Sequence, residues 1–192
     1  MMTLPNIITL ARIGLIPVFV GLFYLQPNYL EGEPLAWINN SLVAIYVLIS
    51  STDFLDGLLA RKLNQISELG AFLDPVADKL MVAIVLVVLL QDDPRILLAI
   101  PVAVIIGREI TVSALREWMA ELGARRAVAV STIGKWKTGL QMCSIALLII
   151  GSMPEAPPSS TALGILLLYC AAVLTFWSMV LYLKAAWPLV RD

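Results

Sequence analysis

Long apolar segments constrain the fold of this chain more than any other feature. Of its 192 residues, 60% are hydrophobic and 14% are charged, whereas a soluble domain is about half apolar and about a quarter charged. A helix of roughly 20 apolar residues crosses a bilayer. Segments close to that length cover residues 7–25, 35–61, 73–91, 96–118, 132–151 and 161–186. The sequence therefore predicts an all-α, polytopic membrane protein with six transmembrane helices.

The connections between these segments are short, and they contain turn-forming residues. Leu4-Pro5-Asn6 predicts a short N-terminal interfacial helix that leads into the first segment. The chain shows no internal repeat and no low-complexity tract. We therefore expect a single transmembrane domain over residues 1–192, folded as one helical bundle in the lipid bilayer.

Lysine and arginine are distributed unevenly, and this bias predicts the orientation in the membrane, since cytoplasmic connections are enriched in both. If the N-terminus is cytoplasmic, the inner side holds Arg61, Lys62, Arg125, Arg126, Lys184 and Arg191. The outer connections then hold Arg95 beside several acidic residues. We expect a multi-pass protein of the cell (inner) membrane with both termini cytoplasmic.

Four aspartates lie close together in this apolar chain: Asp53, Asp56, Asp74 and Asp78. An ionised group in hydrocarbon costs about 2.5–3.5 kcal/mol on insertion scales, so four acids require a cation or water beside them. Their spacings of i, i+3 and i, i+4 put each pair on one helical face. Because segments 35–61 and 73–91 meet at the inner boundary, the two pairs are expected to face each other there.

This set of oxygen ligands predicts two divalent cations, Mg²⁺ or Mn²⁺. The chain contains no histidine, and its two cysteines lie singly within apolar runs, which argues against zinc. Two such ions stabilise both the attacking and the leaving oxygen of a phosphoryl displacement. A divalent-cation transporter would use the same acids, but its site is expected near the bilayer midplane. A structural scaffold would explain the hydrophobicity and not the aspartates.

The order Asp53-x₂-Asp56-Gly57-x₂-Ala60-Arg61-x₈-Gly70-x₃-Asp74-x₃-Asp78 resembles the signature of the CDP-alcohol phosphotransferase family at every specified position. That family is also built on six transmembrane helices, so the resemblance covers nearly the whole chain. It implies an enzyme of phospholipid biosynthesis, active as a homodimer, that transfers a phosphatidyl group from CDP-diacylglycerol to an alcohol and releases CMP. The resemblance implies Asp53, Asp56 and Asp74 as metal ligands, and Asp78 as a metal ligand and the catalytic base.

Further motifs resemble the bacterial phosphatidylglycerophosphate synthase branch of the family. They are Leu4-Pro5-Asn6-x₂-Thr9-x₂-Arg12, Leu73-Asp74-Pro75-x-Ala77-Asp78-Lys79-Leu80, Gly107-Arg108-Glu109 and Gly134-Lys135-x-Lys137-Thr138. The acceptor implied is glycerol 3-phosphate. A sibling enzyme that uses inositol phosphate or phosphatidylglycerol is the alternative, and no nucleic-acid partner is expected.

The remaining candidate site residues form two groups, of which the first follows the family pattern and the second follows from the need of the acceptor phosphate for cations. For CDP-diacylglycerol binding they are Asn6, Thr9, Arg12, Gly57, Ala60, Arg61, Ser67 and Gly70. For binding the acceptor phosphate they are Arg108, Lys135, Lys137 and Arg116, with Arg125 and Arg126 as further candidates. Arg108 lies about 18 Å into its segment, so it must face the bundle interior or a polar cavity. Its alternative role is a structural ion pair with a carboxylate, and Lys135 is alternatively a positive-inside anchor.

Overall fold

A computed structural model describes residues 4–26, 36–63, 68–123, 133–154 and 156–190, which form helices and short turns. For residues 4, 5, 36, 53–63, 68, 69, 71, 133–136 and 188–190 the description covers the backbone alone. The helices are α1 (Leu4–Tyr24), α2 (Ala36–Leu63), α3 (Glu68–Asp92), α4 (Ile96–Glu121), α5 (Ile133–Gly151) and α6 (Pro158–Val190). The predicted all-α class is confirmed for this part of the chain.

Each helix overlaps one of the apolar segments predicted from the sequence, and two of the differences at the helix starts concern specific predictions. Gly70, predicted to lie in a connection, instead lies within the first turn of α3, which begins at Glu68. A glycine in a helix costs about 1 kcal/mol relative to alanine, too little to end a helix that packs against its neighbours. The second difference is at the N-terminus, where α1 is continuous from Leu4 and the described residues form no separate interfacial helix.

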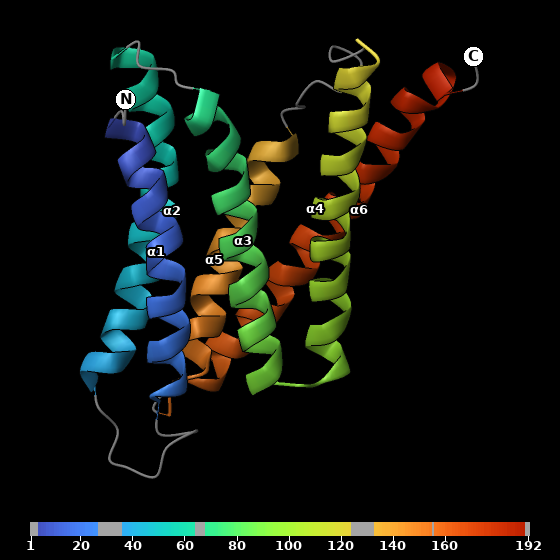
Figure 1. Cartoon of the computed structure of the whole chain (residues 1–192). Coiled ribbons are helices and arrows are strands. Elements are labelled where there is room, and N and C mark those ends of the chain that lie inside the picture. Colours follow the sequence, from blue (N-terminus) through green and yellow to red (C-terminus); the bar gives the residue numbers. More distant parts are fainter. Residues whose placement is uncertain (1–3, 27–35, 64–67, 124–132, 155, 191–192) are drawn as a thin grey trace.

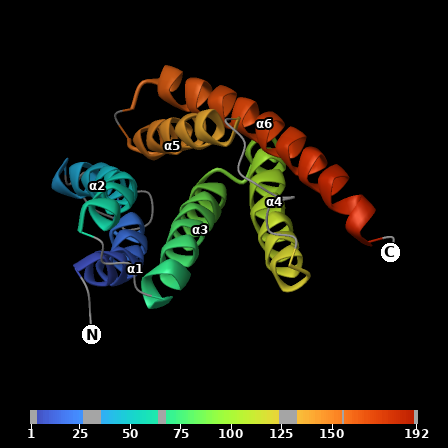
Figure 2. The same ribbon diagram turned by 90° about the horizontal axis from the view of Figure 1, so that it is seen from above.

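Successive helices run in opposite directions, and Figure 1 shows both termini at the end of the bundle where α2 ends and α3 begins. Helix α1 packs against both α2 and α3, while α6 packs against α4 and α5. Helix α5 also contacts α2 and α3, so it joins the two halves of the bundle. Viewed from above, α3 lies between the α1–α2 pair and α4 (Figure 2).

The middle of the bundle is filled by apolar side chains from all of these helices. Phe19, Leu42, Leu86, Ile105 and Ile145 are buried in one continuous core. Large apolar side chains also cover the outside, as expected of a surface that faces lipid: they include Trp37, Phe72, Ile96, Ile110, Val173 and Trp187.

Three of the helices are long and apolar enough to cross a membrane, judged over the described residues. They are Asn6–Tyr24, Ile96–Glu121 and Pro158–Trp187. Helix α6 has 33 residues and is therefore about 50 Å long, which exceeds a hydrocarbon core of about 30 Å. It leans away from the other helices toward its C-terminal end (Figure 1). The protein is a helical membrane protein.

The turn between α3 and α4, at the end opposite the termini, is braced by an ion pair. Arg95 donates from Nε and from a terminal nitrogen to the two carboxylate oxygens of Asp93, both at 2.6 Å. This hydrogen bonding by Arg95 lowers the pKa of Asp93 below its usual range. Because Arg95 is exposed, water screens the pair, and we expect it to contribute little to stability.

The α5–α6 contact gives a prediction about stability. A Cβ atom at Gly164 would lie 2.9 Å from Leu148 Cγ, so Gly164→Ala is expected to destabilise the protein by about 1–3 kcal/mol through overpacking. Gly21→Ala is the matched control, since nothing lies within 4 Å of that Cβ position. It should be neutral or stabilising by up to about 1 kcal/mol. Thermal unfolding in detergent measures both, and equal melting temperatures for the two variants would contradict the prediction.

Candidate active site

Two carboxylates of α3 are held by two polar side chains of α1. Thr9 donates a hydrogen bond from Oγ1 to Asp74 Oδ1 at 2.5 Å, and Arg12 forms an ion pair with Asp78. Thr9 and Arg12 are buried one helical turn apart, which matches the one-turn separation of the two aspartates on α3. The Arg12 side chain is 2% exposed and that of Asp78 is 39% exposed. Helix α1 therefore supports the aspartates from behind and leaves Asp78 accessible.

These aspartates border a cavity of about 400 Å³ that five helices line. Its charged and polar lining consists of Arg12, Ser50, Asp74, Asp78, Lys79, Glu109, Lys137, Thr138 and Gln141. The other lining residues are apolar or aromatic, among them Tyr46, Ile49 and Met81. The α3 wall of the cavity thus presents two carboxylates and the ammonium of Lys79, the α4 wall presents Glu109, and the α5 wall presents the ammonium of Lys137.

The α2 wall of the cavity is formed by Tyr46, Ile49 and Ser50. Helix α2 continues beyond them to Leu63. Positions 53 and 56 lie on this helix, three to seven residues after Ile49 and Ser50. The side chains of Asp53, Asp56, Gly57, Ala60 and Arg61 lie outside the described residues, as does Ser67 altogether. The facing arrangement of the four aspartates therefore stays a prediction.

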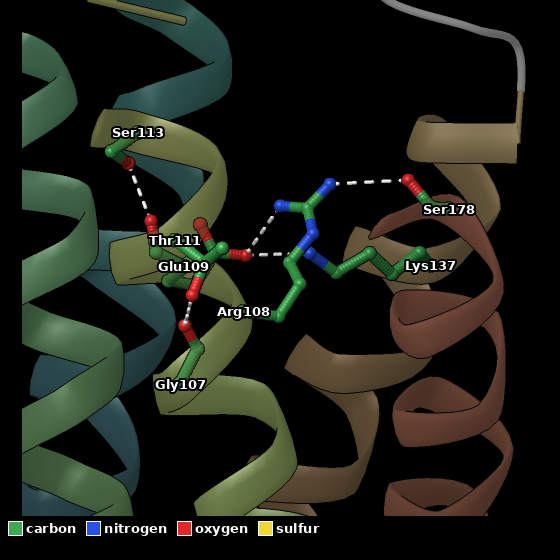
Figure 3. A network of polar contacts seen from close by, with 7 residues as sticks. All are labelled: Gly107, Arg108, Glu109, Thr111, Ser113, Lys137 and Ser178. Atoms are coloured by element: carbon green, nitrogen blue, oxygen red, sulfur yellow. Dashed lines mark hydrogen bonds and ion pairs between the residues drawn. The ribbon is translucent and has the colours of Figure 1, made fainter. Parts of the chain in front are cut away.

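A network of charged side chains crosses the bundle from the cavity to α6 (Figure 3). Lys137 donates from Nζ to Glu109 Oε1 at 2.5 Å, and Arg108 donates to the same oxygen at 3.0 Å. A second guanidinium nitrogen of Arg108 donates to Ser178 Oγ at 3.2 Å. The guanidinium carbon also lies 5.9 Å from the centroid of the Tyr182 ring, a cation–π distance.

The residues predicted to bind the acceptor phosphate are placed differently from one another. Lys137 lines the cavity, whereas Arg108 turns toward α6 and is not among the lining residues. Arg116 is exposed on α4. The side chain of Lys135 lies outside the described residues, as do Arg125 and Arg126. The structure therefore brings Lys137 to the same cavity as Asp74 and Asp78.

Of the predicted nucleotide-side residues that are described, Asn6, Thr9 and Arg12 are buried on α1, and Gly70 is buried on α3. Thr9 and Arg12 contact the aspartates, a role that sequence reasoning did not assign. Glu109 was part of a quoted motif, but sequence reasoning gave it no role in the site. The signal that points to it is its position in the same apolar segment as Arg108, because buried charges require partners.

Comparison with known proteins agrees with the signature in the sequence. Residues 2–177 match the CDP-alcohol phosphatidyltransferase family. A CDP-diacylglycerol–glycerol-3-phosphate 3-phosphatidyltransferase of Pseudomonas fluorescens is 49% identical over 97% of this chain and 91% of its own length. A protein of the same name from Yersinia enterocolitica is 46% identical over 97% of this chain and 96% of its own length. Another, from Pectobacterium atrosepticum, is 48% identical over 95% of this chain and 94% of its own length. The chain belongs to the CDP-alcohol phosphatidyltransferase family.

Proposed function

We infer that this protein is an enzyme that transfers the phosphatidyl group of CDP-diacylglycerol to glycerol 3-phosphate. The products are phosphatidylglycerol phosphate and CMP. Family membership and relatives of this name that align over nearly their full length support the reaction. The observation that carries it within the structure is the cavity lined by Asp74 and Asp78 of α3 and by Lys137 of α5. It offers carboxylates to a metal-bound pyrophosphate and a cation to the acceptor phosphate.

The membrane arrangement we propose has all six helices crossing the bilayer. Helices α2, α3 and α5 are not among the three spans selected by length and hydropathy over the described residues, but Figure 1 shows them running alongside α1 and α4. The bias of lysine and arginine places both termini, and with them the cavity, on the cytoplasmic side of the cell membrane. There the soluble acceptor would meet a lipid substrate in the same leaflet. The family resemblance further supports a homodimer.

Carboxylate oxygens at this end of the cavity would hold two divalent ions. Asp74 and Asp78 both border the cavity from one face of α3, and positions 53 and 56 continue α2 beyond the lining residues Ile49 and Ser50. Within the described residues no group of three or more candidate ligands gathers. An oxygen donor set without histidine fits Mg²⁺ or Mn²⁺. When bound, these ions neutralise charge that develops on the leaving phosphate.

Asp78 is the residue that we assign as the general base. Its carboxylate is accessible from the cavity, and its ion pair with the buried Arg12 fixes its position. Asp78 accepts the proton of the sn-1 hydroxyl of glycerol 3-phosphate while that oxygen attacks the phosphatidyl phosphorus. The bond from this phosphorus to the CMP oxygen breaks, and CMP leaves with the electron pair. Thr9 orients Asp74 through its hydrogen bond.

Substrate recognition divides between the two sides of the cavity. Lys137 lines the cavity on α5, and we propose that it binds the acceptor phosphate, with Lys135 and Arg116 assisting from the cytoplasmic side. The nucleotide of CDP-diacylglycerol is proposed to lie on the side of Asn6, Thr9, Arg12, Gly57, Ala60, Arg61, Ser67 and Gly70. Arg108 does not line the cavity, so we propose that it acts on the acceptor site indirectly, through the residues that it contacts.

Removal of divalent ions tests this function. Purified protein with CDP-diacylglycerol and labelled glycerol 3-phosphate should form labelled lipid and CMP in equal amounts. We expect EDTA to lower both by about 100-fold or more, since metal ions contribute several kcal/mol to such displacements. Added Mg²⁺ or Mn²⁺ should restore both products. Full activity in the presence of excess EDTA would overturn the metal-assisted mechanism, and lipid formation without CMP release would overturn the reaction itself.

A further inference from the structure

Glu109 holds two cations with a single carboxylate oxygen, deep in the bundle. Lys137 Nζ and Arg108 both donate to its Oε1, at 2.5 and 3.0 Å. The exposed fractions of these side chains are 6% for Lys137, 12% for Arg108 and 25% for Glu109. One carboxylate between two cations leaves the group with a single net positive charge. Such a cluster can bind an anion. When no anion is bound, the carboxylate already neutralises part of its positive charge.

The two cations are anchored differently. Arg108 has further contacts on α6 with Ser178 and Tyr182 and does not line the cavity. Lys137 lines the cavity, and Glu109 is its hydrogen-bond partner in the described part of the chain. An ammonium group has three donors, and among the described residues Glu109 takes one of those of Lys137, which leaves the other two to meet a ligand in the cavity.

We propose that Glu109 is a positioning residue for the acceptor site. It holds the ammonium of Lys137 on the cavity wall, where that group meets the phosphate of glycerol 3-phosphate, and Arg108 braces Glu109 from α6. This inference rests on the proposed function. The flexible four-carbon stem of lysine gives the ammonium many rotamers, whereas Glu109 projects from the middle of the rigid helix α4.

The test measures glycerol 3-phosphate affinity by isothermal titration calorimetry in detergent, together with KM for each substrate. Glu109→Ala is expected to weaken the affinity and raise KM for glycerol 3-phosphate by about 10- to 100-fold, because a small misplacement of a binding group has effects of this size. KM for CDP-diacylglycerol should stay within about two-fold of the wild-type value, since the carboxylates of α3 are untouched.

A double-mutant cycle shows whether Glu109 acts through Lys137. In a Lys137→Met background, Glu109→Ala should change the affinity by less than about two-fold, because coupled residues are non-additive. Glu109→Gln keeps an oxygen acceptor, so this variant should bind glycerol 3-phosphate more tightly than Glu109→Ala. It replaces Glu109→Ala in the experiment if the alanine variant folds poorly. Glu117→Ala, at an exposed position of the same helix, is the matched control and should bind like the wild type.

Three results would overturn the inference. The first is the full loss of affinity from Glu109→Ala in the Lys137→Met background, and the second is a parallel rise in KM for both substrates, which indicates a purely structural role. The third is wild-type affinity in the Glu109→Ala variant. Wild-type protein that does not bind glycerol 3-phosphate at all would overturn the proposed acceptor, and this inference with it.

Discussion

Asp78→Asn is expected to lower kcat by about 10²- to 10⁴-fold, the usual contribution of a general base. Asparagine has nearly the same shape as aspartate but cannot accept the proton of the attacking hydroxyl. KM for both substrates should change much less than kcat, because the cavity wall is preserved. CMP release under steady-state conditions measures the effect, and turnover at the wild-type rate would remove Asp78 from the role of base.

The ion pair with Arg12 requires a control for this variant. Removing one partner of a fully buried pair destabilises a protein by about 3–5 kcal/mol; water screens the exposed carboxylate of Asp78, so we expect a smaller loss here, and part of the loss in activity of Asp78→Asn comes from reduced folding. The double variant Asp78→Asn with Arg12→Met removes both charges and should regain stability but not activity. Recovery of activity along with stability would show that Asp78 has a structural role only.

Lys137→Met is expected to raise KM for glycerol 3-phosphate by about 10- to 100-fold, since a hydrogen bond to a charged group contributes about 1.5–3 kcal/mol. Methionine keeps an unbranched apolar stem, so the packing of α5 should survive. KM for CDP-diacylglycerol should stay near its wild-type value. Steady-state kinetics with each substrate varied in turn separates the two effects.

Lys184→Met is the matched control, because Lys184 is an exposed lysine near the same end of the bundle. It carries the same change of charge and should leave both KM values unchanged. If Lys137→Met raised KM for CDP-diacylglycerol instead, Lys137 would belong to the nucleotide side of the cavity, and the acceptor would have to bind elsewhere.

Helix positions could be predicted from the sequence because bilayer thickness sets the length of an apolar helix. The segment predicted at 96–118 and the observed Ile96–Glu121 begin at the same residue. The start of α3 could not be predicted in the same way. Glu68 and Gly70 read as a polar connection, and the contacts of α3 with α1, α4 and α5 outweigh that local preference.

The residue types of the site could also be predicted, since a charge in an apolar segment requires a function or a partner. This rule selected the aspartates and Arg108, and the structure has Asp74 and Asp78 bordering the cavity and Arg108 in contact with Glu109 and Ser178. Their partners could not be predicted, because they depend on how each helix is rotated about its axis. The rotation of α4 turns Arg108 to Ser178 and Glu109 to Lys137, although the two residues are neighbours in the sequence.

Helix α1 shows the same limit. A motif resemblance placed Thr9 and Arg12 near the nucleotide, but their contacts are with Asp74 and Asp78. Only packing between helices brings together residues that are 65 and 66 positions apart in the chain. Both roles are compatible, because a side chain that orients a carboxylate lies close to whatever that carboxylate binds.

We expect this cavity to transfer a phosphatidyl group specifically to glycerol 3-phosphate. CMP release by the purified protein, given CDP-diacylglycerol and Mg²⁺, should be measured with glycerol 3-phosphate, inositol phosphate and phosphatidylglycerol in parallel. We predict rapid release with glycerol 3-phosphate and background release with the other two acceptors. Background release with glycerol 3-phosphate and rapid release with either of the others would show that the enzyme uses a different acceptor.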